Sequence, residues 1–183
     1  MFEKKFKEII VSDDTHKVTF TLKSYHKVKG HDDTLPYEAT LCANGVKVAT
    51  CFNDGWGGET NVDIILTSRA PLLDTIDSVL KDATLTFEYN GEKHTFPLKL
   101  NDIADMLAYD MEIYQEVKKK QKKNIYFMFP DGHIMYAPID ENKNLTLDDF
   151  KDNEEKKKQI KELIEYTIKE YNCILLNSNI DFL

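Results

Sequence analysis

Arginine is almost absent from this chain of 183 residues, because Arg69 is the single arginine among 24 basic residues. Arginine reads phosphates and guanine edges through two parallel hydrogen bonds, whereas lysine acts as a point charge. The 32 acidic residues bring the formal net charge to −8. This balance argues against a protein that reads a nucleic-acid sequence directly.

Cysteine is scarce as well, and no C-x-x-C pair joins Cys42, Cys51 and Cys173. An odd number of unpaired cysteines argues against a disulfide framework and against a structural zinc site. If Asn44-Gly45 is a two-residue hairpin turn, Cys42 lies opposite Lys47 and Cys51 opposite Glu38. The two sulfur atoms are then too far apart to bond. We expect free thiols in a reducing compartment, the cytoplasm.

Long apolar runs are missing too: no stretch approaches the ~18–20 residues that a membrane span needs. The opening residues, Met1 to Glu8, carry charges and lack the apolar region of a secretory signal. Hydrophobic residues still make up 42% of the chain, which is enough for a core and excludes disorder as the main state. We therefore expect a soluble protein with no membrane partner.

Glycine is used mainly at turns. Three Asx-Gly pairs separate alternating apolar runs, namely Asn44-Gly45, Asn90-Gly91 and Asp131-Gly132. Such pairs predict β-hairpins, because type I′ turns need positive φ at both central residues. In the first hairpin Leu41 is expected to face Val48, and Tyr37 to face Phe52. The strands of the third hairpin, Ile125 to Phe129 and Ile134 to Ile139, are apolar on both faces, so we expect both faces to be covered.

The remaining elements follow from hydrophobic periodicity. A strand is predicted over 17–25, and the residues 6–11 before it fit either a strand or a helix. Helices are predicted from Pro71, from a cap at Asn101 or Asp102, and over 153–171, with Asn172 as a left-handed exit. The fold class is therefore α+β, with a mainly antiparallel sheet built from hairpins and about three helices. We expect a larger lobe over 1–120 and a smaller one over 121–183, packed as one domain.

The segment from Asn53 to Asn61 is the most unusual part of the sequence. It holds the only tryptophan and three of the seven glycines. Glycine lets a backbone approach a ligand and point successive N–H groups at an anion, and a tryptophan held between glycines can stack on a base or a partner side chain. The candidate ligand-binding residues are Asn53, Asp54, Gly55, Trp56, Gly57, Gly58, Thr60 and Asn61, with Arg69 before the first helix as a counter-charge.

Each of these features also has a plainer explanation. The glycine-rich segment fits a wide turn that reverses the chain, with Trp56 folded back as a lid on the core. Arg69 fits a surface arginine paired with a carboxylate. His26, His31, Asp32 and Asp33 resemble a metal or acid–base cluster, yet the same residue types are common in turns. His94 is expected as a hydrogen-bonded core histidine and His133 as an exposed residue at a hairpin tip.

The stretch from Ala43 to Gly58, ANGVKVATCFNDGWGG, resembles a segment of small bacteriophage and prophage accessory proteins, a group without an assigned reaction. The hairpin from Ile125 to Tyr136, followed by a lysine-rich helix and a short closing strand, is similar too, and together these cover about half of the chain. The resemblance implies a phage or mobile-element protein in the host-cell cytoplasm. Many proteins of that class blunt host defence by binding a protein or a nucleotide signal.

Three hypotheses follow for function. The first is a non-catalytic binding protein whose Gly–Trp segment, with Arg69, contacts a small phosphorylated ligand or a host protein. The second is an acidic interaction module, or nucleic-acid mimic, that occupies a basic site on a host protein. The third is a metal-dependent hydrolase that uses His26, His31, Asp32 or Asp33. No catalytic set, Walker loop, dinucleotide fingerprint or EF-hand pattern is present, so we expect no cofactor or bound metal.

Overall fold

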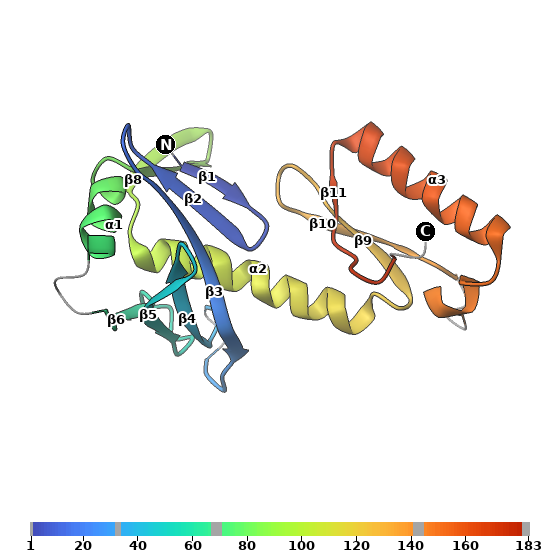
Figure 1. The fold of residues 1–183 in the computed structure, drawn as a ribbon, viewed down its shortest axis with the longest axis horizontal. Helices are drawn as coiled ribbons and strands as arrows, with labels where there is room; N and C mark the ends of the chain where they lie inside the picture. The colour runs from blue at the N-terminus through green and yellow to red at the C-terminus, as the bar shows by residue number, and fades with distance from the viewer. Residues whose placement is uncertain (1, 32–33, 67–70, 141–144, 181–183) are drawn as a thin grey trace. The chain divides into compact units, whose positions relative to one another are not determined.

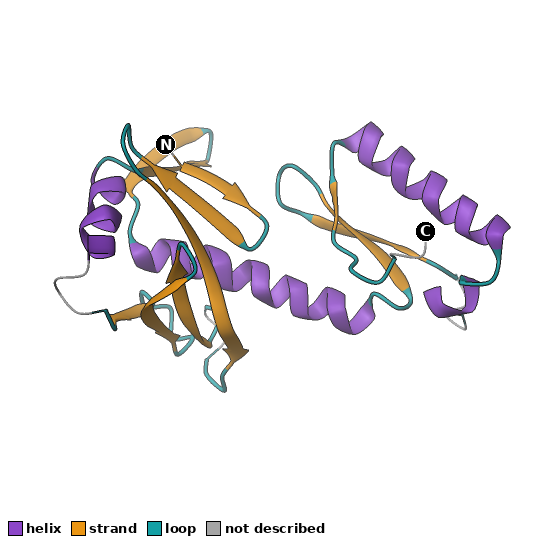
Figure 2. Cartoon of the chain, viewed as in Figure 1, coloured by secondary structure: helices purple, strands orange, loops and turns teal. Residues whose placement is uncertain are grey.

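The computed structural model describes residues 2–31, 34–66, 71–140 and 145–180. These residues form three α-helices and eleven strands, and every strand pair is antiparallel, which confirms the α+β prediction (Figures 1 and 2). The chain divides into two compact units, Met1–Glu112 and Ile113–Leu183. No helix within the described residues is long and apolar enough to cross a membrane.

The first unit is built on a six-stranded meander in which each strand pairs with the next along the chain. Its strands are β1 (Phe2–Lys5), β2 (Glu8–Ser12), β3 (Lys17–Lys27), β4 (Tyr37–Ala43), β5 (Val46–Asn53) and β6 (Asn61–Ile64). The segment that fitted either a strand or a helix is thus a strand, β2, because Ile9 pairs with Phe20 and both side chains are fully buried.

Two helices complete the core of this unit. Helix α1 (Pro71–Lys81) buries Ile76 and Val79, and the first part of α2 (Leu100–Lys120) buries Ile103, Leu107 and two alanines. These side chains belong to one hydrophobic cluster with the inward-facing residues of β2 to β5. Figure 1 shows the long strand β3 crossing α2. The cap of α2 differs from the prediction, since the helix begins at Leu100 and Asp102 accepts from the Lys99 amide at 2.8 Å.

The register of the first hairpin corrects the sequence prediction. The turn is as expected, with Asn44 and Gly45 at φ of 50° and 80°. An irregularity next to Leu41 then shifts the pairing, so Leu41 faces Ala49 and Tyr37 faces Asn53. Such a bulge adds one residue to one strand, so every later side chain on it changes face. Phe52, expected on the apolar face, is 40% exposed, whereas Asn53 turns inward and is 5% exposed.

The same shift places Cys51 opposite Ala39 and leaves Phe52 opposite Glu38. The pairing of Cys51 with Glu38 was therefore wrong, because the prediction assumed an unbroken ladder. All three cysteines are buried free thiols.

A separate hairpin, β7 (Thr84–Tyr89) and β8 (Glu92–Pro97), follows α1. The predicted turn at Asn90-Gly91 is confirmed, and Phe87 lies opposite His94 in the hairpin. Its aromatic face is exposed, however, since Phe87 and Phe96 are about half exposed. His94 stacks on Phe87, and its buried Nε2 atom has no hydrogen-bond partner among the residues that the structure describes. The expectation of a hydrogen-bonded core histidine was wrong, because the two-stranded sheet is open on this side.

The second unit holds a three-stranded sheet in the order β10-β9-β11. Its elements are β9 (Asn124–Met128), β10 (Ile134–Pro138), a 3-10 turn (Leu147–Phe150), α3 (Glu154–Tyr171) and β11 (Ile174–Leu175). Both predicted ends of α3 are confirmed, because Asn153 accepts from the Lys156 amide and Asn172 is left-handed with φ of 50°.

Fewer apolar side chains are buried in this unit than the sequence pattern predicts. The central strand β9 is covered, but Met135 and Tyr136 on β10 are more than half exposed, so the expectation of two covered faces was wrong for that strand. On α3 only Ile160 and Ile164 are buried. A small sheet with one helix has too little surface to cover every apolar residue that it carries.

Candidate functional site

The Gly–Trp loop, defined here as residues 53–61, connects β5 to β6. Phe52 pairs with Asn61 across the two antiparallel strands, so the loop reverses the chain. Gly55 and Gly57 have φ of 84° and 81°, a region that favours glycine. A Cβ atom on Gly55 would lie 1.9 Å from the His31 carbonyl oxygen. Gly55 therefore lets the loop pack directly against the segment that precedes β4.

Backbone hydrogen bonds join the loop to that segment. The amide of His31 donates to the Asp54 carbonyl at 3.0 Å, and the amide of Thr34 donates to the Gly55 carbonyl at 3.1 Å. Within the loop, the amide of Gly55 donates to Asn53 Oδ1 and the amide of Trp56 to Asp54 Oδ1. The sequence predicts that N–H groups of this loop could bind an anion, but these two already donate hydrogen bonds to side chains of the loop itself.

A network of buried side chains holds the base of the loop. Asn53 donates from Nδ2 to Thr60 Oγ1 at 2.9 Å and accepts from the Thr34 hydroxyl at 2.9 Å. Thr60, which is 4% exposed, donates to Asp105 Oδ1 at 2.5 Å. Tyr37, fully buried on β4, donates to the same oxygen at 3.0 Å. The loop is thereby tied to β4 and to α2.

Burial shifts the acid–base properties of this network. The pKa of Asp105 is raised above its usual value, mainly by desolvation, and the charges of Asp102 and Glu59 raise it further. Desolvation also raises the pKa of the Tyr37 hydroxyl well above its usual value, and that of the Cys51 thiol to about 12. Removing a carboxylate from water disfavours its charged form unless a cation compensates. No cation among the described residues pairs with Asp105.

A cavity of about 330 Å³ opens beside the network. It is lined by Thr34, Leu35, Tyr37, Asn53, Gly58, Asp105 and Tyr109. Only Asn53 and Gly58 were among the predicted ligand-binding residues. The cavity is of the size that small ligands occupy, with convergent polar groups and one carboxyl of perturbed pKa.

Trp56 lies outside this cavity and points to solvent. Its side chain is 68% exposed, and its ring stacks on His31 with the centroids 4.2 Å apart. The alternative in which Trp56 forms a lid on the core is therefore excluded. Because a stacked pair restricts both rings, the indole presents one open face in a defined position.

Some of the predicted site residues fall elsewhere. Arg69, Asp32 and Asp33 lie outside the described residues. Asn61 begins β6, and Asp54, Gly55 and Gly57 form the outer part of the loop. The ligand role of these residues stays a prediction.

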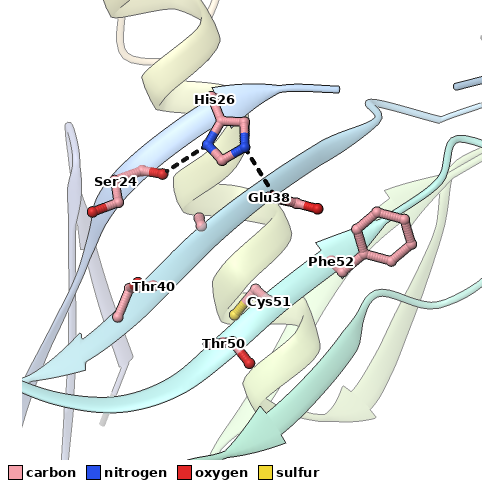
Figure 3. A pocket seen from close by; sticks show the side chains of 8 residues that line it. Ser24, His26, Glu38, Thr40, Thr50, Cys51 and Phe52 are labelled. Carbon is pink, nitrogen blue, oxygen red and sulfur yellow. Dashed lines mark hydrogen bonds and ion pairs between the residues drawn. The ribbon is translucent and has the colours of Figure 1, made fainter. Parts of the chain in front are cut away.

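His26 lies at a second cavity, of about 320 Å³, on the face of β3, β4 and β5 that Figure 3 shows. Its Nδ1 atom is 3.1 Å from the Ser24 carbonyl oxygen and its Nε2 atom is 2.9 Å from Glu38 Oε2. Both ring nitrogens are thus engaged, while His31 stacks on Trp56. Within the described ranges no three side chains of metal-binding type gather.

Comparisons with protein families, with curated proteins and with solved structures find no match for this chain. The site must therefore be interpreted from its own geometry.

Sequence reasoning missed Tyr37, Asp105 and Tyr109. Tyr37 was assigned only to the apolar face of a strand, and Asp105 lies within the apolar stretch of α2 between Ala104 and Leu107, both of which are buried. A carboxylate so close to the core is a signal that a polar partner is present. The partners themselves, Thr60 and Tyr37, are 45 and 68 residues away in the chain.

Proposed function

We propose that this chain is a non-catalytic binding protein that contacts a partner protein through the Gly–Trp loop. The observation that carries the proposal is Trp56, whose ring is 68% exposed although a network of buried hydrogen bonds holds its loop. A tryptophan held in place on a surface is a typical interface anchor, because it buries a large area and loses little side-chain entropy on binding.

The charge of the chain supports a basic partner surface. The formal net charge is −8, and the acidic residues Asp54 and Glu59 flank Trp56 within the loop. Complementary charge steers association and disfavours acidic partners. The interaction-module hypothesis and the Gly–Trp hypothesis therefore converge on one surface. On the resemblance to phage accessory proteins alone, we propose a host protein as the partner, with interference in host defence as the consequence.

A small phosphorylated ligand, such as a nucleotide signal, is the second candidate. The open face of the Trp56 ring favours it, because a base can stack there. The surroundings favour it less, since the Gly55 and Trp56 amides are already engaged and Asp105 lines the adjacent cavity. The metal-dependent hydrolase hypothesis has less support, because His26 and His31 make other contacts.

The test compares three baits for capture from bacterial lysate: the unchanged chain, Trp56→Ala and Tyr89→Ala. Tyr89 is a matched control, because it is 65% exposed and lies on β7, which belongs to a different sheet from β5 and β6. We expect a protein that is retained by the unchanged chain and by Tyr89→Ala and lost with Trp56→Ala. Because Trp56 is the only tryptophan, adding the purified protein should also shift the intrinsic fluorescence.

Equal retention by all three baits, or binding without any change in fluorescence, would contradict the protein-binding proposal. In parallel, nucleotides and cyclic dinucleotides are titrated against the fluorescence. A shift with these compounds, together with a raised melting temperature, would favour the second candidate.

A further inference from the structure

We propose that the cavity beside the Gly–Trp loop receives a guanidinium group, supplied by an arginine side chain of the partner protein. This inference rests on the proposed function for the source of the group. The preference of the cavity for a guanidinium does not depend on the proposed function, and small guanidinium compounds test it without a partner protein.

The first argument is the unused hydrogen-bonding capacity of Asp105. Its Oδ1 atom accepts from both Thr60 and Tyr37, at 2.5 and 3.0 Å. Its Oδ2 atom has no hydrogen-bond partner within the described part of the chain. A carboxylate accepts about four hydrogen bonds. Because Asp105 lines the cavity, its remaining acceptor positions suit a ligand that carries several N–H donors.

The second argument is the sign of the charge around the cavity. None of the seven lining residues is cationic. Asp102 and Glu59 add to the negative potential at Asp105, and the Lys99 ammonium, 3.4 Å from Glu59, is exposed. An anion that enters the cavity would be repelled by this negative charge. A cation would instead pair with the half-buried carboxylate of Asp105, which has no cationic partner among the described residues.

The third argument is the shape and chemistry of the walls. Tyr109 contributes an aromatic side chain to the cavity lining and is 60% exposed, and a planar guanidinium stacks well on an aromatic ring. Leu35 provides apolar surface for the methylene chain behind the charge. The planar donor fork of arginine matches a carboxylate better than the single ammonium of lysine does. Together these features favour arginine over lysine.

Binding of a cation should be coupled to the proton of Asp105. Burial raises the pKa of this carboxyl. Among the described residues, the other titratable groups around it are Tyr37, Cys51, Asp102 and Glu59, together with Tyr109 at the cavity. A bound guanidinium favours the ionised form and so lowers that pKa again. The affinity for the cation should therefore fall as the pH falls through the raised pKa of Asp105. Below that pH the free protein holds one proton on Asp105, and this proton must leave before the carboxylate can pair with the cation.

The probe is Nα-acetyl-arginine amide, titrated into the full chain and followed by amide NMR shifts. Its control, Nα-acetyl-citrulline amide, has nearly the same shape without the charge. We expect arginine amide to shift the signals of residues 34–37, 53–60 and 105, and citrulline amide to shift none of them at the same concentration. Equal shifts with the two probes, or shifts confined to other residues, would overturn the proposal.

Asp105→Asn tests the carboxylate directly, because an amide can still accept from Thr60 and Tyr37 and so should leave the network intact. We expect it to weaken binding of arginine amide by about tenfold or more, and Tyr109→Leu to weaken it by about two- to fivefold. Glu88→Gln is the control, since it also removes one negative charge but lies on the exposed hairpin. Unchanged affinity of a folded Asp105→Asn protein would reject the cavity as the site.

The source of the group is tested with agmatine and with an Ac-Gly-Arg-Gly-NH2 tripeptide. The tripeptide should bind at least as tightly as agmatine, and agmatine binding much more tightly would reject a protein source. If arginine amide binds normally but Trp56→Ala still retains every captured protein, the guanidinium inference is supported and the proposed function through the Gly–Trp loop is rejected. If Trp56→Ala loses its partner but Asp105→Asn keeps it, the cavity inference fails and the proposed function stands.

Discussion

At the scale of single residues, Asp105 does most to define the site. It accepts two hydrogen bonds from buried hydroxyls but has no cationic partner among the residues that the structure describes. Its position is stable only because Tyr37 and Thr60 compensate part of the cost of burying it. A residue of this kind is typical of a functional site, since stability alone would favour a neutral side chain there.

Asp105→Asn should therefore stabilise the protein near neutral pH. Burial raises the pKa of Asp105 in the folded state. The protonated carboxyl therefore contributes to folding stability fully below the unfolded-state pKa, and this contribution is lost as the pH rises through the folded-state pKa. Asparagine stays neutral at every pH, so the variant keeps this stability. We expect the difference in melting temperature between variant and unchanged chain to be near zero at low pH and positive at neutral pH.

Glu88→Gln serves as the control for this pH series, because Glu88 is exposed on β7. The variant should track the unchanged chain at every pH. A variant Asp105→Asn that is less stable at neutral pH than at low pH, relative to the unchanged chain, would show that the ionised carboxylate stabilises the fold.

At the scale of elements, two turns use glycine for different reasons. Gly45 and Gly55 have nearly the same φ, 80° and 84°. A Cβ on Gly45 would meet nothing within 4 Å, whereas a Cβ on Gly55 would lie 1.9 Å from the His31 carbonyl oxygen. The first glycine is required only by backbone conformation, and the second also by the contact between two loops.

The pair Gly45→Ala and Gly55→Ala separates these effects. Both variants should lose about 1 kcal/mol of stability, because alanine is strained in the left-handed backbone conformation. Gly55→Ala should lose at least about 2 kcal/mol more, because the backbone at His31 must move to make room for the added Cβ atom. Urea unfolding measures both values. Trp56 fluorescence should change in Gly55→Ala and stay unchanged in Gly45→Ala, and equal losses of stability would contradict the loop contact.

Helix α3 depends on its two caps. Asn153 Oδ1 accepts from the Lys156 amide at 3.0 Å, so Asn153→Ala should lower the stability of the chain by about 1 kcal/mol. Asn172 is left-handed at the other end, and Asn172→Gly should raise stability by a few tenths of a kcal/mol, because glycine adopts this conformation without strain. Circular dichroism during heating measures both. A change of the same sign in the two variants would contradict the cap assignment.

At the scale of the whole molecule, charge is the dominant property. With a net charge of −8 and a single arginine, the chain attracts cations at long range and repels polyanions. Such attraction acts over a Debye length and weakens as salt is added. The two compact units keep separate hydrophobic clusters, and the candidate site lies entirely in the first.

Binding of the Ac-Gly-Arg-Gly-NH2 tripeptide should therefore weaken when the salt concentration rises from about 0.02 to about 0.5 M. We expect the dissociation constant, measured by NMR, to rise several-fold for the unchanged chain. Asp105→Asn should show a smaller rise, because one charge of the site is gone. An affinity that does not change with salt would contradict an electrostatic contribution to the site.

The features that the sequence determined by itself are local ones. The turns at Asn44-Gly45 and Asn90-Gly91, the proline start of α1 and the left-handed exit of α3 at Asn172 follow from residues that act on their immediate neighbours, so a pattern of a few residues suffices. The α+β class follows as well, because hairpins and helices were each recognised from their periodicity.

Only the tertiary structure decided the rest. The bulge between the Leu41–Ala49 and Cys42–Lys47 pairs turns Asn53 inward and Phe52 outward. A short sequence pattern in one strand does not predict it, because a bulge is a property of how two strands pair. Asp105, Tyr37 and Thr60 meet through folding of segments that are distant in the chain. A hydrogen-bonded cavity depends on such long-range contacts, so its residues could not be named before the fold was known.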